Sequence, residues 1–494
     1  MVRRAATLGW CLVLAGCGLL GPQTRGPDGL SVYDGNLRDL ARQGQFEDAL
    51  ELAETDGDAA GDDLLATLNL ATIEHYAGSL DSSNDHLLSA DIEIDDRFTK
   101  SVTKAALSMI TNDRALKWSP SRLERPMIHV YGALNYLALG EMDEAAVEAR
   151  RLSSLLDEMH EIETRDANQD VYRTLRYFSG AVFEAAGELN DADVAYRHAG
   201  FENEPLKSRN QDGLALGEVV LLVESGFVAN RVERSLNLLL NADDADYLRN
   251  GSDRSRHHAA SCLSRQRLAF AYESFGASLD TDDCAPRPPR QRPRRRPRKR
   301  GGDNNNDDDD DHEKEVAYLL RVAWPVMHNS IDAVPLGYVR AYAASSSTVV
   351  AARDATAVSA VPAPSMADYE GETLLSADLS GAIVREFNGR APGILIKAVA
   401  RAAVKYTVVD ALADDSEVAQ VIGNVLAALL ERADTRSWNL LPSDMHLVRL
   451  QLPAGVHQVL VEFDSGGGNT LPLVLDDVVV IADGVTVVSA RAWP

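Results

Sequence analysis

The chain has 494 residues and carries 75 Asp and Glu against 49 Lys and Arg, which gives a formal net charge of −26. Apolar residues make up 45% of the sequence and charged residues 25%. This composition is ordinary for a globular protein and excludes a wholly disordered, collagen-like or polytopic membrane protein. The excess of acidic residues excludes nucleic acid as an expected partner, because phosphate backbones require a basic surface.

Residues 1–16 have the pattern of a secretory signal peptide. Arg3 and Arg4 precede an apolar stretch that is shorter than the roughly 20 residues needed to span a membrane. The stretch ends in Leu14-Ala15-Gly16-Cys17, which resembles the lipobox of bacterial lipoproteins. We therefore expect acylation of Cys17 and attachment to a membrane through the N-terminal lipid. The alternative is an ordinary secretory signal with an incidental cysteine.

The residue after Cys17 is Gly18 rather than Asp. By resemblance to the sorting rules of lipoproteins, this favours the outer membrane, with the chain facing the periplasm. Residues 17–33 contain Gly, Pro and Thr without apolar periodicity, so we expect them to form a lipidated tether.

Residues 34–255 are predicted to form a helical domain, because apolar residues recur at helical spacing from Val32 to about Leu240. Within it, four segments resemble the tetratricopeptide repeat, in which a glycine separates two helices that carry small and aromatic residues at fixed offsets. Stacked pairs of this kind bury a shared core and leave a concave binding surface. The alternative is a generic helical bundle. The repeat glycines are Gly44, Gly78, Gly140 and Gly187, and the best-matched positions around the last two are Ala133, Tyr136, Ala145, Ala149, Leu152, Gly180, Phe183, Ala192, Tyr196 and Ala199.

Residues 256–315 are predicted to be a disordered, charged linker. They include a block rich in Arg and Pro followed by a block rich in Asp and Asn, and neither composition can build a core. The basic part, from Arg287 to Arg300, is also a candidate for contact with an anionic surface. Cys262 and Cys284 lie in the same segment, and they either form a disulfide in an oxidising compartment or remain as two thiols.

Residues 316–442 are predicted to form an α+β domain, and residues 443–494 a small β domain whose short strands are separated by glycine turns. The expected fold is therefore mainly α, a tetratricopeptide-like helical array, followed by a smaller α+β domain with a β-rich C-terminal end. Within 316–442 the expected elements are a helix at 316–322, strands at 348–352 and 382–387, and helices near 393–412 and 416–433.

Motifs that carry chemistry are missing from the sequence. It contains no P-loop, dinucleotide fingerprint, nucleophile elbow or set of spaced metal ligands. Ser101 and Lys104 have the Ser-x-x-Lys spacing, but the other motifs of penicillin-binding enzymes do not follow. We therefore predict no catalytic residue, no cofactor and no metal site.

Three segments carry a resemblance to a known family. They are Val223-Glu224-Ser225-Gly226-Phe227, Ala323-Trp324-Pro325, and Ala433-Asp434-Thr435-Arg436-Ser437-Trp438 followed by Leu440-Leu441-Pro442. In this order they are similar to an uncharacterised family of bacterial envelope lipoproteins with tetratricopeptide-like helices. The resemblance covers most of the mature chain, and its most specific part is residues 434–438. It implies no reaction and no catalytic residue, and the family pattern does not include the charged insertion.

We expect the protein to be a scaffold that holds another envelope protein or a peptide. The aromatic repeat positions Tyr136 and Phe183 are expected in the core. Contacts with the partner are therefore assigned to their polar neighbours, Asn135 and Glu184.

The alternative function is a cell-wall-related periplasmic enzyme or ligand-binding domain in residues 316–494. It rests on the α+β pattern of this region and on a conspicuous group of polar and aromatic side chains. These side chains, Asp434, Arg436 and Trp438, are further candidate interaction residues.

Overall fold

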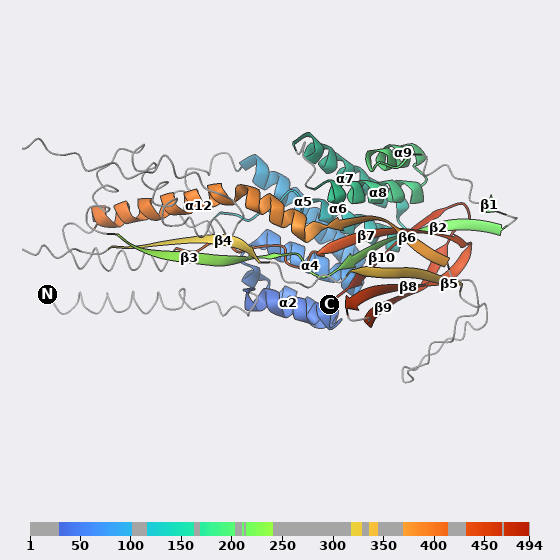
Figure 1. Ribbon diagram of the computed structural model, residues 1–494, viewed down its shortest axis with the longest axis horizontal. Helices are drawn as coiled ribbons and strands as arrows, with labels where there is room; N and C mark the ends of the chain where they lie inside the picture. Colours follow the sequence, from blue (N-terminus) through green and yellow to red (C-terminus); the bar gives the residue numbers. More distant parts are fainter. Residues whose placement is uncertain are drawn as a thin grey trace, which may run out of the picture.

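The computed structural model describes residues 29–100, 116–162, 168–202, 210–211, 214–240, 318–328, 335–343, 369–412, 431–466 and 469–493. Within these residues, a layer of helices comes first and a region with a β-sheet follows (Figure 1). The predicted order, an α part followed by an α+β part, is confirmed. Other predicted features lie outside the described residues: the signal peptide, Cys17, Cys262, Cys284, the segment from Arg287 to Arg300, the strand at 348–352 and most of the helix near 416–433.

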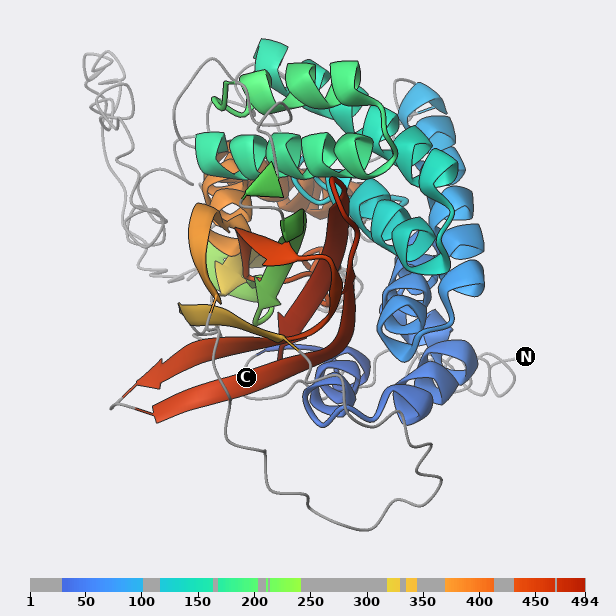
Figure 2. The same ribbon diagram turned by 90° about the vertical axis from the view of Figure 1, so that its right-hand side faces the viewer.

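Successive helices of the first part each pack against the next helix in the chain. Figure 2 shows that together they curve around one side of the sheet. No helix in the described part of the chain combines the length and the apolarity that a membrane span requires. The bounds are α2 (Val32–Arg42), α3 (Phe46–Thr55), η1 (Gly57–Ala60), α4 (Asp63–Ala77), α5 (Leu80–Lys100), α6 (Pro126–Leu139), α7 (Met142–Ile162), α8 (Gln169–Ala185) and α9 (Leu189–His198).

Glycines make the turns within the helix pairs. Gly44, Gly78, Gly140 and Gly187 lie just after α2, α4, α6 and α8, with φ angles of 69°, 82°, 79° and 80°. Other residues adopt this left-handed conformation only at a cost, which is why glycine is favoured at the end of a helix. These are the four glycines that the sequence pattern singled out.

Small residues bring the paired helices close together. Ala133 of α6 and both Ala145 and Ala149 of α7 are fully buried. Gly180 of α8 lies directly against the ring of Tyr196 on α9, and a Cβ atom built at residue 180 would be 2.7 Å from that ring. The close approach of these two helices therefore depends on the missing side chain.

The main sheet has eight strands among the described residues, in the order β1-β2-β7-β6-β5-β8-β9, and β10 pairs with β2 in parallel. Two further strands, β3 and β4, form a separate antiparallel ribbon, and α12 (Leu379–Leu412) packs against β4. The strands are β1 (Asn210–Gln211), β2 (Leu214–Ser225), β3 (Asn230–Leu240), β4 (Tyr318–His328), β5 (Leu336–Ala343), β6 (Tyr369–Asp378), β7 (Asp444–Pro453), β8 (Gly455–Gly466), β9 (Asn469–Val480) and β10 (Val485–Ala492).

The two faces of the sheet belong to two different hydrophobic cores. Val219, Leu221 and Val223 of β2 pack with residues of β5, β7, β8 and β9. The alternate residues, Val220 and Leu222, pack in the core that contains the helices. Alternation with a period of two places successive side chains on opposite faces of a strand. One face of the sheet therefore encloses its own core, and the other face supports the helical layer.

Several sequence predictions are wrong in detail. Residues 214–240, expected to be helical, form β2 and β3. Residues 318–322, within the helix expected at 316–322, belong to β4, and the strand expected at 382–387 lies inside α12. The small β domain expected at 443–494 is not separate, since β7 to β10 share one sheet with β2, β5 and β6. Short apolar runs have no clear period, so their pattern does not distinguish a buried strand from a buried helix.

Replacing Gly180 with Ala is expected to lower the free energy of unfolding by about 1–3 kcal/mol, because the new methyl group would overlap the ring of Tyr196. The matched control is Gly389→Ala in α12, where a Cβ atom meets nothing within 4 Å and alanine favours the helix. Urea unfolding of both variants measures the difference. Equal stability of the two variants would contradict the packing described for α8 and α9.

Candidate functional site

The inner face of the helical layer is covered by the protein's own sheet. Helix α6 contacts β10, and α8 contacts β6, β7 and β10. Figure 2 shows the helices wrapped around these strands. Residues 431–443, which we call the connector, also pack here, since Trp438, Leu440 and Leu441 belong to the same core. The surface that helix pairs would offer to a partner is therefore occupied from within the chain.

A buried polar group, the Arg491 cluster, joins α4 and α6 to the sheet. The hydroxyl of Tyr76 donates to a carboxylate oxygen of Glu224 at 2.9 Å and accepts from Nη1 of Arg491 at 2.8 Å. The hydroxyl of Tyr131 is 3.4 Å from the other oxygen of Glu224. The guanidinium of Arg491 also lies over the ring of Trp493, 3.9 Å from its centroid. The tyrosine hydroxyl thus links a buried cation to a buried anion.

Burial shifts the pKa values of the ionisable side chains in and beside this cluster. It raises the pKa of Glu224, although Arg491 and the two tyrosine hydroxyls favour the charged carboxylate. Burial also lowers the pKa of the neighbouring His75 to about 4, and the charge of Arg491 acts in the same direction, while a hydrogen bond to Asn135 opposes it. His75 is therefore neutral at neutral pH, and its Nδ1 donates to Oδ1 of Asn135 at 2.5 Å.

A second buried group, the Arg449 cluster, joins α8 and α9 to the sheet. Arg449 of β7 donates to a carboxylate oxygen of Glu184 at 3.0 Å and to one of Glu218 at 3.1 Å. Its other terminal nitrogen donates to the hydroxyls of Tyr177 and Tyr196 at 3.0 and 3.1 Å. Charge-assisted bonds of this kind are the strong ones in proteins, and here they cross the boundary between the two layers.

The connector is fastened to the first helices by its own polar side chains. Nε of Arg436 donates to Asp434 at 2.8 Å, and Nη2 donates to the carbonyl of Leu116 at 2.7 Å. The indole of Trp438 is fully buried and donates to the hydroxyl of Thr72 on α4 at 3.0 Å. Residues 434–438, the most specific part of the family resemblance, therefore serve to attach the connector to the helical layer.

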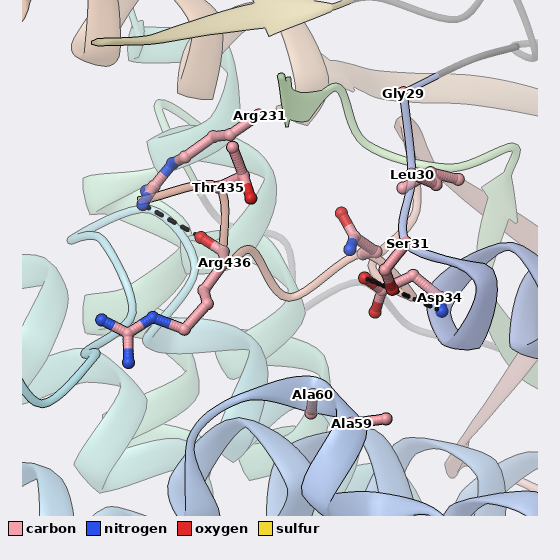
Figure 3. Close-up of a pocket in the computed structure, with 10 residues that line it drawn as sticks. Gly29, Leu30, Ser31, Asp34, Ala59, Ala60, Arg231, Thr435 and Arg436 are labelled. Carbon is pink, nitrogen blue, oxygen red and sulfur yellow. Dashed lines mark hydrogen bonds between the residues drawn. The ribbon is translucent and has the colours of Figure 1, made fainter. Parts of the chain in front are cut away.

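A small cavity lies beside the connector (Figure 3). Its volume is about 20 Å³, which is room for about one water molecule. Nη1 of Arg231 donates to the carbonyl of Arg436 at 3.1 Å, and Figure 3 shows the Arg436 side chain directed away from Ser31 and Asp34 on the opposite wall. The cavity can hold solvent, and it is too small for an organic ligand.

The residues predicted to contact a partner are mostly inside the protein. Asn135 and Glu184 are buried and bond within the helix and sheet contacts, so the prediction that they contact a partner at the surface is wrong. Strand β7 covers Glu184 through Arg449, and Asn135 is covered by α4 and α5, where it bonds to His75, Ser83 and Asn84. Arg436 and Trp438 are also buried, and Asp434 is half-buried against Arg436.

Three charged residues that join the two layers were not predicted from the sequence. Glu224 follows a run of apolar residues in β2, and Arg449 and Arg491 each lie between two apolar residues of their strand; all three positions face the helices. A charged residue inside an apolar strand is the signal that could have found them, since buried charges require a partner.

A serine and a histidine face each other in the C-terminal part. Ser376 of β6 and His446 of β7 are register partners, and Oγ of the serine is 2.8 Å from Nδ1 of the histidine. Ser376 is exposed, and burial lowers the pKa of His446 to about 4. This is the distance of a nucleophile and its base, although so low a pKa makes the imidazole a weak base. Among the described residues, no group of His, Cys, Asp and Glu could hold a metal ion.

The neutral state of His75 predicts a pH dependence of stability. Its pKa is about 4 in the folded chain, against 6.5 for an ordinary histidine, so below pH 6.5 the unfolded chain takes up a proton that the folded chain does not. The free energy of unfolding should therefore fall by about 3 kcal/mol between pH 6.5 and pH 4 on account of this residue. Urea unfolding at steps of pH should show a smaller loss for His75→Gln.

The control for this measurement is His198→Gln, which changes an exposed histidine on α9. The control should follow the original chain across the same pH range. A loss of stability that is the same in His75→Gln and in the original chain would contradict a buried, neutral His75.

Comparison of the chain with models of known protein families, with characterised proteins and with solved structures finds no match. No relative therefore assigns a reaction or a partner to these clusters. The Arg491 and Arg449 clusters make contacts that hold the helices against the sheet, and the outer faces of the helices remain exposed.

Proposed function

We propose that the chain is a lipoprotein of the bacterial cell envelope, anchored to the outer membrane through Cys17, whose helical layer holds a protein or peptide partner in the periplasm. The lipobox-like sequence before Cys17 supports the anchor. The observation that carries the proposed binding role is the row of helix pairs held firmly against a sheet. A rigid row of helices presents a fixed surface, which lowers the entropic cost of binding.

Within this proposal the helix pairs are tetratricopeptide-like repeats. Gly44 and Gly78 are 34 residues apart, which is the period of such repeats. The left-handed turn glycines and the small residues at the helix contacts support the same assignment. The array differs from a free solenoid because the sheet covers its inner face. The partner is therefore expected to bind the faces of the helices that point away from the sheet.

The proposed anchor and binding surface can be tested together in intact cells. A photoreactive amino acid at Ile92 of α5, Leu139 of α6 or Val194 of α9, all exposed apolar positions, is expected to form a discrete crosslinked adduct. The matched control is Val479 of β9, an apolar residue that is 54% exposed, within the range of the helical positions, but lies on the sheet. Adducts at Val479 and at none of the helical positions would contradict the proposal.

The same strains test the lipid anchor. Labelled palmitate should enter the original chain, and Cys17→Ser should abolish the label because the thiol is the acylated group. In Cys17→Ser the crosslinked adducts at the helical positions should also disappear, because the chain is no longer anchored. Labelling that persists in Cys17→Ser would remove the anchor from the proposal.

The second candidate function is a hydrolase in residues 316–494, and the Ser376 and His446 pair favours it. A fluorophosphonate probe should then label the chain, and Ser376→Ala should abolish the label because the attacking hydroxyl is gone. The control is Ser489→Ala, a change of another serine in the sheet. Equal labelling of the two variants, or none of the original chain, would exclude this site.

A further inference from the structure

A groove lies between α5, α6 and α7. Its volume is about 140 Å³, roughly ten times the 10–15 Å³ or so that one water needs. Helices α5 and α7 pack against other helices, whereas α6 also contacts β10. Its lining includes the apolar Leu87, Leu88 and Ile128, the ring of Tyr136, and the carboxylates of Glu144 and Glu148.

The charge in this groove is negative. Its lining carries Asp91, Glu144 and Glu148 against Arg151, and Asp91 is paired at 3.2 Å with Arg125, which precedes α6. Glu148 bonds to Nδ1 of the buried His129 at 2.7 Å and to Arg151 at 3.1 Å, so it is held in place. Glu144 is exposed and pairs with no cation among the described residues. An unneutralised carboxylate is therefore available at the rim.

An aromatic ring stands among these carboxylates. Tyr136 is half-buried, and its pKa is raised by burial and then by the charges of Glu148, Glu144 and Glu141. A ring face beside carboxylates suits a lysine or arginine, which gains from the ring quadrupole as well as from the opposite charge.

Apolar side chains continue the groove along α5. Leu87 and Ile128 form part of its buried floor, while Leu88 is 44% and Ile92 is 62% exposed beside it. Leu88 and Ile92 are four residues apart, so they lie on one side of the helix. Exposed aliphatic residues next to a rim of carboxylates fit a peptide that carries both kinds of side chain.

We infer that this groove binds a peptide segment of the partner that places lysine or arginine against Tyr136, Glu144 and Glu148, and an apolar side chain against Leu88. The inference rests on the proposed function, because it names the chemistry of the partner that the helical layer would hold. Long basic side chains can also cover apolar surface with their aliphatic stems.

The test measures binding of fluorescent peptides to the full mature chain by anisotropy. Three peptides of equal length alternate Lys with Leu, Glu with Leu, or Lys with Ser. The Lys and Leu peptide should bind most tightly, because only it supplies both charge and apolar contact. Leu88→Ser and Glu144→Lys should each weaken its binding about tenfold, a loss of about 1.4 kcal/mol.

Two matched changes on α9 control for surface chemistry and net charge. Leu189→Ser removes a leucine that is 49% exposed, and Asp191→Lys reverses an exposed carboxylate. Both should leave binding within about twofold of the original chain, because α9 lies outside the groove. A basic peptide attracted only by the acidic surface would be weakened equally by Glu144→Lys and Asp191→Lys.

Three outcomes would overturn the groove assignment. They are equal affinity for the Glu and Leu peptide, unchanged binding in Leu88→Ser and Glu144→Lys, and equal losses in the α9 controls. Such a result combined with crosslinked adducts at Val194 would leave the proposed function standing and remove only this site. Absence of adducts at every helical position would instead remove the proposed function.

Discussion

Two buried arginines of the sheet take hydrogen-bond partners from the helices as well as from the sheet, and this requirement governs how the two layers fit together. Arg449 reaches Glu184 of α8, and Arg491 reaches Glu224 through the hydroxyl of Tyr76 on α4. Glu184 is itself buried, and an uncompensated buried charge costs several kcal/mol, so the helical layer cannot be well packed without the sheet. The helical part and the sheet part of this chain are therefore expected to fold as one cooperative unit.

The packing of the sheet against the helices also determines which faces of the helices remain accessible to a partner. In an isolated solenoid the inner helices line a concave surface that is open to a ligand. Here β10, β6 and β7 cover that side, and Trp438 of the connector completes the contact with α4. Any partner of the helical layer therefore meets the outer helices, where the groove between α5 and α7 lies. A site on a rigid pair of helices holds its side chains more firmly than a site on a loop.

The helix pairs could be predicted because their signals are local. A glycine at a left-handed turn and small residues one or two helical turns away, such as Gly140 with Ala133, specify a hairpin without reference to distant residues. The strand β2 was missed because it is apolar on both faces and has no alternation.

The buried clusters could not be predicted from spacing at all. Arg491 and Tyr76 are 415 residues apart, and Arg449 and Glu184 are 265 apart. Only the fold brings such residues together, so the sequence shows an isolated charge in an apolar strand and not its partner. The same distance explains why Glu184 looked like a surface residue, because the strand that covers it comes much later in the chain. Asn135 is covered instead by the preceding helices α4 and α5.

The ribbon of β3 and β4 has a consequence for the long segment between these strands. Leu240 and Tyr318 are register partners, so the chain leaves the ribbon and returns to it at neighbouring residues. Closing a loop costs only about 0.6 kcal/mol more for each doubling of its length. Because residues 240 and 318 are held side by side, a longer or shorter connection between them changes the free energy of the fold little. Natural variation, or an engineered domain, can be accommodated there at little thermodynamic cost.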